Sequence, residues 1–591
     1  MSNVSLHTQS YLSWFSVDGE VKLDDSEGTA SLADLIQAVV DKKHFVSLSD
    51  GQVVALSESL RKRLEDLSYL GELAKGRGSG QAGRFSLRVC QFLLPFLGES
   101  ISDFPGAELP PESNQWIQKY NDAMQETPPV PSELKATLRP YQEEGYLWLS
   151  RLDKAGAGAC LADDMGLGKT VQAIALILAR ADEGPTLIVA PTSVCANWKA
   201  EFQKFAPSLN CEVFGPGDRA QVLNKLGPRH VLIASYGLLQ SEQQAFKKIK
   251  WRIAVLDEAQ AIKNAHAKRS QAALEIHAAF RVVTTGTPIE NNLSELWSIF
   301  NFIIPGLLGS REGFQRRFAA AIEHDNSQDA LKSLRGIVSP FMLRRRKDQV
   351  LNDLPPKEEI YYPVEISPDE RAFYDNLRKK ILADLESHDE SEGQRHIRVL
   401  AGIMKLRLAV DHPRLVAGGE ALHGSKLDAF LELLRRILQS NHKVLVFSQF
   451  VKFLDIVRET LDSEGISYEY LDGARTPKER AASVENFQNG DVPVFLISLK
   501  AGGLGLNLTQ ADYVIHLDSW WNPAVEDQAS DRAHRLGQRK KVTIYHLQAI
   551  NTIEDKVKAL HQRKRGLADN ILSETDTIET LPLEELLRLI K

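Results

Sequence analysis

Apolar residues along most of the chain gather in short, nearly continuous runs that polar segments separate. Such runs predict strands buried on both faces, as in parallel sheets covered by helices. Amphipathic segments such as 170–181 lie between the runs and predict the helices of βα repeats. The runs form two clusters, at 186–190, 230–235, 253–257 and 281–286, and at 443–448, 494–499, 513–518 and 542–547. Because a helical pattern fills about 290–425 between them, we predict an α/β fold with two parallel-sheet lobes and helical insertions.

Residues 1–130 follow a different pattern. Two Asp-Gly pairs, Asp18-Gly19 and Asp50-Gly51, each stand between alternating segments and predict two β-hairpins. A helical pattern covers 57–70, and the proline-bearing segment 127–133 predicts a linker. We therefore predict a small α+β domain before the first lobe.

Composition limits the classes of protein that fit. With 591 residues, 43% of them hydrophobic, the chain can bury several cores. No apolar run approaches the roughly 18 residues that span a bilayer, and the N-terminus lacks the pattern of a signal peptide. We expect a cytoplasmic protein with no membrane partner. The four cysteines are widely spaced and form no C-x-x-C pair, which predicts neither a disulfide nor a zinc site.

The net charge of −7 argues against a protein that coats nucleic acid through bulk charge. Any nucleic-acid contact must therefore be local. The basic run Arg344-Arg345-Arg346-Lys347 could supply one, or it could be a solvated surface or a patch of salt bridges between lobes. The sequence leaves these alternatives open.

A glycine-rich segment, residues 163–170, leads into the first amphipathic helix. Its glycines let backbone N–H groups close on phosphate oxygens, Lys169 would neutralise the phosphates, and the Thr170 hydroxyl would bind Mg²⁺. Asp163 replaces the first glycine of the G-x-x-x-x-G-K-[ST] pattern, which leaves an ordinary glycine-rich turn as the alternative. The predicted nucleotide-binding residues in this segment are Asp164, Met165, Gly166, Leu167, Gly168, Lys169 and Thr170.

An acidic pair, Asp257-Glu258, ends the apolar run at 253–257. Chemistry in parallel sheets occurs at the C-terminal ends of strands. Asp257 is placed to bind Mg²⁺, and Glu258 to polarise the water that attacks the γ-phosphate. The alternative is a strand that ends in a solvated acidic turn. Together with the phosphate-binding segment, the pair predicts an ATP hydrolase that uses Mg²⁺.

A third set of residues lies far along the chain. We predict a helix there that carries Gln528 and two arginines, Arg532 and Arg535, which share one face because they are three residues apart. If the second sheet packs against the first, these arginines can reach the γ-phosphate as arginine fingers, which contribute a factor of about 10³ to 10⁵ in rate. Surface salt bridges with Asp527 and Asp531 are the alternative.

These three sets occur in the order and spacing of helicase superfamily two, and the chain resembles its Swi/Snf-type DNA translocases. The resemblance covers about 135–575, and the family's DEMGLGKT appears here as DDMGLGKT. Further matching segments are LRPYQEEGYLWL (138–149), APTSVCANWKAEFQKFAP (190–207), TTGTPIENNLSELWSIFNFI (284–303), FMLRRRKDQV (341–350), LPPK (354–357), DHPRL (411–415), VFSQF (446–450), LDG (471–473), SLKAGGLGLNLTQA (498–511) and DSWWNPAVEDQASDRAHRLGQ (518–538).

The resemblance implies two RecA-like lobes with Gln142 reading the adenine. The implied domains are an N-terminal helicase-associated domain (1–130), a first lobe with a helical protrusion (131–345), an interlobe linker with a second protrusion (346–425), a second lobe (426–560), and a brace helix and tail (561–591). The implied DNA-facing residues are Thr192, Asn197, Trp198, Ser235, Tyr236, Ser448, Gln449, Lys500, Gly502 and Gly503.

Three aromatic side chains lie beside the arginine set. Trp520 and Trp521 could stack on a base or sugar, or pack inside the protein, and we expect packing for at least one of them. We expect His534 to pack or hydrogen bond, because phosphoryl transfer needs positioning and charge more than another base.

By resemblance, the chain is a DNA-dependent ATPase that moves along double-stranded DNA and displaces bound protein, such as RNA polymerase. A strand-separating helicase and a non-catalytic docking scaffold are the alternatives. We expect a monomer, associated with the nucleoid if the source is bacterial. The N-terminal domain would regulate or dock, or it would be a passive extension.

Overall fold

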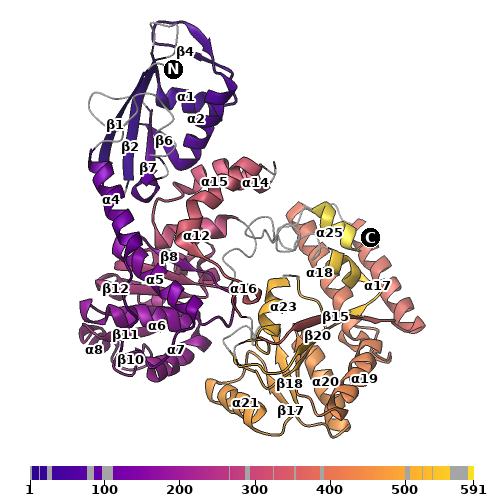
Figure 1. Ribbon diagram of the computed structural model, residues 1–591. Coiled ribbons are helices and arrows are strands. Elements are labelled where there is room, and N and C mark those ends of the chain that lie inside the picture. The colour runs from indigo at the N-terminus through magenta and orange to yellow at the C-terminus, as the bar shows by residue number, and fades with distance from the viewer. Residues whose placement is uncertain are drawn as a thin grey trace. The chain divides into compact units, whose positions relative to one another are not determined.

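The computed structural model shown in Figure 1 describes most of the chain. The described residues are 3–11, 14–22, 29–75, 85–95, 97, 111–264, 267–286, 293–323, 325, 327–351, 354–386, 392–499, 506–521, 523–535, 537–559 and 583–590. Contacts divide the chain into two compact units. The first comprises 1–163, 168–288 and 292–345, and the second comprises 164–167, 289–291 and 346–591.

A parallel sheet forms the centre of the first unit. In the described ranges it has seven strands, in the order β10-β11-β9-β12-β13-β8-β14. They are β8 (Ala159–Leu161), β9 (Thr186–Ala190), β10 (Asn210–Val213), β11 (His230–Ser235), β12 (Trp251–Asp257), β13 (Ala278–Thr284) and β14 (Met342–Leu343). Every neighbouring pair is parallel. The four predicted runs are confirmed as β9, β11, β12 and β13.

Helices cover this sheet, as the α/β pattern predicts (Figure 1). They are α5 (Pro140–Ala155), α6 (Lys169–Ala179), α7 (Thr192–Phe205), α8 (Arg219–Asn224), α9 (Tyr236–Ser241), α10 (Gln243–Lys247) and α11 (Lys268–Leu274). Helix α5 begins with Pro140 at its first position and ends where Gly156 adopts a left-handed φ of 75°. A helical insertion follows, with α12 (Leu293–Ile303), α13 (Arg311–Phe314), a π-helical segment (Gln315–Ala319), α14 (Ala320–Glu323) and α15 (Gln328–Val338).

The N-terminal region is α+β, as predicted, and its contacts group it with the first unit. Its elements are β1 (Asn3–Tyr11), β2 (Trp14–Lys22), β3 (Thr29–Ser31), α1 (Leu32–Val40), β4 (Phe45–Ser47), β5 (Val53–Ala55), α2 (Glu58–Leu70), β6 (Gly71–Lys75), β7 (Phe85–Cys90) and α4 (Pro111–Gln125). Strands β1, β2, β7 and β6 form an antiparallel sheet, with β3 beside β2.

One of the two predicted hairpin turns is confirmed. Asp50-Gly51 joins β4 to β5, where Gly51 has a φ of 84° and Asp50 Oδ1 accepts the Gln52 N–H at 3.0 Å. The turn predicted at Asp18-Gly19 is wrong, because both residues lie inside β2 and pair with β1. The β1–β2 ladder runs the full length of both strands, so strand pairing overrides the local turn preference.

A half-buried arginine joins the N-terminal region to the helical insertion. Arg317, in the π-helical segment, donates to the carbonyls of Gly71 at 2.5 Å and Leu308 at 3.0 Å. Glu72 Oε2 accepts the Ser310 N–H at 2.8 Å, and the Tyr69 and Phe318 rings lie 5.5 Å apart. Burial lowers the pKa of Arg317 to about 10. The guanidinium therefore satisfies carbonyls where α2 ends and between α12 and α13.

A second parallel sheet forms the centre of the second unit. Its order is β15-β20-β19-β16-β18-β17, six strands among the residues that the structure describes. They are β15 (Lys357–Val364), β16 (Val444–Ser448), β17 (Tyr468–Leu471), β18 (Val494–Ser498), β19 (Tyr513–His516) and β20 (Val542–Ala549). The four runs predicted here are confirmed as β16, β18, β19 and β20.

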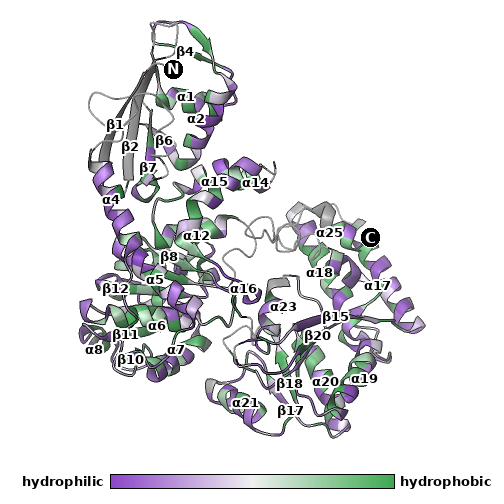
Figure 2. Cartoon of the chain, viewed as in Figure 1, coloured by the Kyte–Doolittle hydropathy of each residue, from purple (hydrophilic) through white to green (hydrophobic). Residues whose placement is uncertain are grey.

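Helices of the second unit pack on both faces of this sheet and beside it. Polar and apolar positions alternate along α17 and α20, as Figure 2 shows. The helices are α16 (Lys347–Val350), α17 (Pro368–Glu386), α18 (Glu392–Asp411), α19 (Ser425–Gln439), α20 (Val451–Ser463), α21 (Pro477–Asn489), α23 (Pro523–Ser530) and α25 (Leu583–Ile590). Helix α25 lies in the segment 561–591, and its Leu586 and Ile590 are buried against α17 and α18. Most of the predicted brace lies outside the described residues.

The sequence pattern missed strands at the sheet edges and very short strands. Strands β10 and β15 alternate or carry polar residues because one side meets solvent. Strands β8 and β14 have three and two residues, too few to show a period. No helix in the described ranges is long and apolar enough to cross a bilayer. All four cysteines are free thiols, three of them buried.

Replacing Arg317 by alanine should loosen the N-terminal region. Each buried carbonyl left without its donor costs about 1–3 kcal/mol. A loss of about 2 kcal/mol corresponds to roughly 3 °C in the unfolding midpoint of the first unit. Thermal unfolding should show this shift for Arg317→Ala. Arg316→Ala is the matched control because Arg316 is exposed, and an equal shift in both variants would contradict the role given to Arg317.

Candidate functional site

The phosphate-binding segment connects β8 to α6, as the motif predicts. Gly166 and Gly168 have left-handed φ values of 89° and 82°. A Cβ on Gly168 would lie 2.5 Å from the Gln142 Nε2, so this position also needs glycine for space. Lys169 begins α6, and its Nζ donates to the Asp163 carbonyl at 2.6 Å. The segment thus has the backbone shape that closes N–H groups on an anion at a helix N-terminus.

Gln142 lies against this segment from the first turn of α5. Its Oε1 accepts the Arg139 N–H at 3.0 Å, which caps the helix, and its Nε2 donates to the Tyr141 hydroxyl at 3.3 Å. The side chain is buried. The structure therefore brings together the residue predicted to read adenine and the residues predicted to hold phosphate.

Asp257 is the most constrained of the predicted catalytic residues. At the end of β12, its Oδ2 accepts the Trp198 indole N–H at 2.8 Å, and its Oδ1 accepts the Thr284 hydroxyl at 2.6 Å. Its backbone carbonyl accepts the Tyr236 hydroxyl at 2.8 Å. Burial and the carboxylates nearby raise the pKa of Tyr236 well above its ordinary value, which keeps it a donor. Three segments therefore meet at Asp257, two at its carboxylate and one at its backbone carbonyl.

Glu258 follows in a backbone conformation that is unusual for a residue with a side chain. Its φ is 49°, in the left-handed region, which costs an L-residue roughly 1–2 kcal/mol. Its Oε2 accepts the Gln260 side-chain N–H at 2.9 Å. Strain of this kind is retained where it aims a functional side chain, which fits the predicted role of Glu258 toward water.

The predicted DNA-facing residues of the first unit separate into two groups. Thr192 and Asn197 are exposed on α7. Trp198 is only 2% exposed, and Tyr236 is also buried, with both side chains hydrogen-bonded to Asp257. Ser235 is buried and caps α9 by accepting the Leu238 N–H at 3.2 Å. These three side chains therefore have partners inside the protein, and the DNA contacts of these residues stay a prediction from the resemblance.

The basic run 344–347 alternates between exposed and buried side chains. Arg345 pairs with Asp163 at 2.6 Å, and Lys347 pairs with Asp531 at 2.7 Å. Burial lowers the pKa of Lys347 despite that carboxylate. Of the alternatives left open by the sequence, salt bridging is the one observed for these two residues. Asp163, which stood as a departure from the phosphate-loop pattern, is the partner of Arg345.

The predicted helix through Gln528 and the two arginines is shorter than expected. Helix α23 ends at Ser530, so Gln528 lies on it and Arg532 and Arg535 follow in turns. The Arg532 carbonyl accepts the Leu508 N–H at 3.0 Å, and the His534 carbonyl accepts the Lys347 Nζ at 2.7 Å. The Arg532 and Ala533 N–H groups donate to carbonyls three residues back, at 3.2 and 3.1 Å, so the chain turns more tightly there than an α-helix does. The prediction that the arginines share a helix face is therefore wrong.

Side chains near the arginines behave as expected. His534 Nε2 lies 2.8 Å from the Pro355 carbonyl, which confirms a hydrogen-bonding residue, and burial lowers its pKa. Trp520 and Trp521 both pack against apolar clusters of the second unit. The Arg535 Nη1 donates to the Leu506 carbonyl at 3.2 Å.

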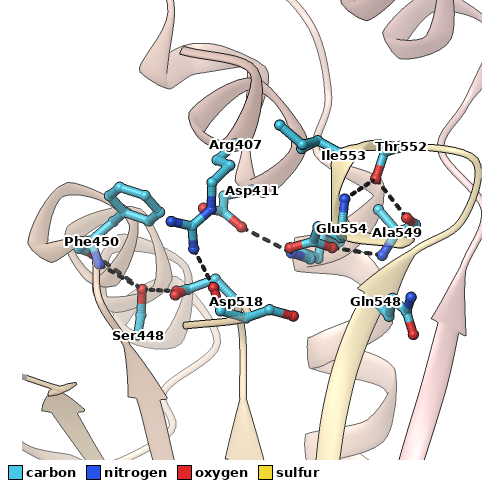
Figure 3. A network of polar contacts seen from close by, with 12 residues as sticks. Arg407, Asp411, Ser448, Phe450, Asp518, Gln548, Ala549, Thr552, Ile553 and Glu554 are labelled. Carbon is cyan, nitrogen blue, oxygen red and sulfur yellow. Dashed lines mark hydrogen bonds and ion pairs between the residues drawn. The ribbon is translucent and has the colours of Figure 1, made fainter. Parts of the chain in front are cut away.

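Ser448, the last residue of β16, belongs to the network in Figure 3, and Gln449 follows it in the chain. The buried Ser448 hydroxyl donates to Asp518, and the Gln449 Nε2 donates to Asp518 Oδ1 at 2.8 Å. Arg407 of α18 donates to Gln449 Oε1 at 3.1 Å and to the Ser519 carbonyl. Ser448 is therefore an internal anchor, whereas Gln449 is half-buried and held in one orientation.

Sequence reasoning did not identify Arg407. The only signal was one arginine within the apolar stretch 400–410 of a helix. Its guanidinium lies over the Trp521 ring at 4.7 Å and the Phe450 ring at 5.4 Å. Burial lowers its pKa, which the carboxylates of Asp518 and Asp411 oppose.

A second buried charge group lies beside this network (Figure 3). The Lys426 Nζ donates to Asp411 Oδ1 at 2.9 Å and to Glu554 Oε1 at 2.7 Å. Two carboxylates thus share one ammonium group in the interior. Burial raises the pKa of Asp411 to about 8.

The donor set fits Mg²⁺ bound together with a nucleotide. Asp257 offers a carboxylate and Thr170 a hydroxyl, both hard oxygen ligands of the kind Mg²⁺ uses beside substrate phosphates. Over the described part of the chain, no group of three or more His, Cys, Asp or Glu side chains is placed to hold a metal ion alone. These two residues would hold the ion only in company with the phosphates.

Some predicted residues fall outside the described part of the chain. Lys500, Gly502 and Gly503 belong to the segment 500–505, and residues 287–292 of the coupling motif also fall outside. For these residues the sequence prediction stands alone.

Comparison with known proteins gives consistent matches. Residues 141–415 match the SNF2-related domain, and residues 425–537 match the helicase conserved C-terminal domain. A Bacillus subtilis protein named as an ATP-dependent helicase/translocase, YwqA, is 39% identical over 476 residues, which cover 77% of this chain and 51% of that protein. The mouse SWI/SNF-related matrix-associated actin-dependent regulator of chromatin subfamily A member 1 is 36% identical over 489 residues, covering 78% of this chain and 46% of that protein.

Among solved structures, the Sulfolobus solfataricus SWI2/SNF2 ATPase core in complex with dsDNA is 37% identical, with a TM-score of 0.40. The match covers 79% of this chain and 99% of that one. The chain spans about half the length of the curated relatives it matches.

Removing the indole donor to Asp257 should slow ATP turnover. Trp198→Phe keeps an aromatic ring but leaves Asp257 with one side-chain donor fewer, so kcat should fall at least about tenfold with little change in KM. Steady-state ATPase assays measure both constants. Trp251→Phe is the matched control, since Trp251 is buried at the start of the same strand and donates to the Phe246 carbonyl. Equal losses in both variants would refute a specific role for Trp198.

The burial of Asp411 should make stability depend on pH. The pKa of Asp411 is raised in the folded state from 3.8 to about 8. Between those values the folded state binds a proton that the unfolded state lacks, so stability falls as the pH rises through this window. Asp411→Asn mimics the protonated carboxyl and should flatten that fall in thermal unfolding from pH 6 to 9. Asp491→Asn, at an exposed carboxylate, should keep the wild-type slope, and a wild-type slope in Asp411→Asn would disprove the assignment.

Proposed function

Because the chain belongs to the SNF2-related ATPases of helicase superfamily two, we propose that it uses ATP hydrolysis to move along double-stranded DNA. The movement would remodel or displace proteins bound to the DNA. That the chain is an ATP hydrolase follows from the family, and the DNA track is the proposed part.

The residues of the first unit divide the work of hydrolysis. The segment 164–170 would hold the phosphates, with Lys169 neutralising their charge and Thr170 and Asp257 holding Mg²⁺. The ion would offset charge on the phosphate oxygens. Glu258 would orient and polarise the attacking water. Gln528, Arg532 and Arg535 keep their predicted catalytic roles, with the arginines stabilising charge on the transferred phosphoryl group.

The contacts of Asp257 support the link from ATP to a track. Its partners Trp198 and Tyr236 lie beside the exposed residues Asn197 and Gly237, in the segments that resemble DNA-facing motifs. Thr284, from the start of the coupling motif, holds the same carboxylate. A shift in either exposed segment would therefore move Asp257, the proposed Mg²⁺ ligand. A shift of Asp257 would likewise move these segments. Such a link is what a DNA-stimulated ATPase requires.

Contacts to phosphates suffice for a track and carry no sequence information. Neutral groups such as Thr192, Asn197 and Gln449 can make them, which is compatible with a net charge of −7. The displaced protein would be one bound to DNA, for which RNA polymerase is our candidate. A strand-separating helicase is the alternative within the same family.

Two substitutions test the chemistry. Lys169→Ala removes the phosphate counter-charge, and Glu258→Gln removes the base, so each should lower DNA-stimulated ATP turnover by about 10²- to 10⁴-fold with unchanged thermal unfolding. Lys225→Ala, at an exposed lysine of the same unit, is the control. Wild-type turnover in either active-site variant would sink the assigned roles.

The choice of track is tested with the wild-type protein. ATP turnover should be highest with double-stranded DNA, compared with single-stranded DNA and RNA. A third strand should be displaced from a triplex, while duplex strands stay paired in an unwinding assay. Strand separation would favour the alternative, and equal turnover with and without every nucleic acid would contradict the proposal.

A further inference from the structure

Arg345 makes a set of contacts that the proposed chemistry does not use. Its Nε donates to Asp163 Oδ1 at 3.0 Å, and its Nη2 donates to Asp163 Oδ2 at 2.6 Å. The same Nη2 donates to Gln172 Oε1 at 2.9 Å, and Nη1 donates to the Tyr141 carbonyl. The backbone N–H of Arg345 adds a third bond to Asp163 Oδ1 at 3.1 Å. A bidentate arginine pair of this kind fixes orientation as well as charge.

The space around the guanidinium is closed. Asp163 has no exposed surface, and the Arg345 side chain is 11% exposed. A Cβ on Gly145 would lie 2.9 Å from the Arg345 Nη2 and 1.8 Å from Gln172 Oε1, so only glycine fits at that point of α5. The arrangement has one geometry, because neither charge can leave its partner without remaining buried and unpaired.

Asp163 connects this pair to the residues that receive phosphate. Its own carbonyl accepts the Lys169 Nζ at 2.6 Å, and the phosphate-binding segment starts at the next residue. A further hydrogen bond lies beside this one, because the Lys347 N–H donates to Asp164 Oδ2 at 3.1 Å. The start of the phosphate-binding segment is thus held by residues 345–347.

The two chain segments run side by side before they reach this point. Strand β14 pairs in parallel with β8, Leu343 opposite Leu161, and the Ala162 N–H donates to the Leu343 carbonyl at 2.7 Å. Beyond Arg345 the chain belongs to the second unit. Arg345 is therefore the last residue of the first unit. Its side chain holds Asp163, which directly precedes the phosphate-binding segment.

We propose that Arg345 is a positioning residue for the ATPase reaction, which holds the phosphate-binding segment in its receptive shape through Asp163. It also transmits nucleotide-dependent changes of that segment to the connection into the second unit. The second statement rests on the proposed DNA stimulation, and the first does not.

Nucleotide affinity tests the first statement without DNA. Arg345→Met, Arg345→Lys and Asp163→Asn should each weaken binding of fluorescent ADP by about tenfold or more. The double variant Arg345→Met/Asp163→Asn should be no weaker than either single one, because both changes remove the same contact. Arg344→Met is the matched control for ADP affinity, since Arg344 is the exposed neighbour. Circular dichroism and thermal unfolding identify folded variants, and Arg345→Lys retains the charge should Arg345→Met not fold.

Steady-state kinetics test the second statement. In folded variants the ratio of duplex-stimulated to DNA-free kcat should fall toward one, together with a raised KM for ATP. ADP affinity within twofold of wild type in folded Arg345→Met or Arg345→Lys would overturn the positioning role. Weaker ADP binding with an unchanged stimulation ratio would overturn transmission alone. If duplex DNA fails to stimulate the wild-type protein, the proposed function fails, and the ADP measurement still decides the positioning role.

Discussion

The hydrogen bonds to Asp257 are the constraint on which the first unit's chemistry depends. Parallel pairing places Asp257 opposite Thr284 and Leu256 opposite Val189, so the C-terminal ends of neighbouring strands meet at one edge of the sheet. The segments that leave this edge must therefore pass the same carboxylate. In the proposed mechanism, the segments that resemble DNA-facing motifs bond directly to Asp257, the proposed Mg²⁺ ligand, so they would need no separate relay to it. The parallel sheet itself brings these segments and Asp257 together at one edge.

Buried charges fix further geometry in both units. Asp163 with Arg345, and Lys426 between Asp411 and Glu554, have almost no exposed surface. Burial of such pairs contributes little net stability, because desolvation offsets their attraction, but a misplaced partner costs several kcal/mol. They therefore select one arrangement over close alternatives. Each group joins segments that are distant in sequence. In an α/β fold with helical insertions, the relative position of such segments is not fixed by local structure.

Periodicity predicted the two parallel sheets because their central strands are apolar on both faces, and the strand-end carboxylate of Asp257 followed from that register. Edge strands such as β10 escaped prediction because solvent on one side allows polar residues. Local preference misled twice. Pairing with β1 places Asp18-Gly19 inside a strand. The hydrogen bonds made by residues 532–534 accompany the early end of α23. Neither Arg345 nor Arg407 could be assigned from sequence, since their partners lie far along the chain.

Segments that resemble DNA-facing motifs share one design in both units. A buried member anchors the segment, as Trp198 does through Asp257 and Ser448 through Asp518. Its neighbour, Asn197 or Gln449, is less buried. Because the anchor fixes the backbone, and Arg407 also fixes the Gln449 side chain, the neighbour would lose little conformational entropy on meeting a phosphate. Preorganised neutral groups can then replace bulk positive charge, which accounts for how a chain of negative net charge would hold a polyanion.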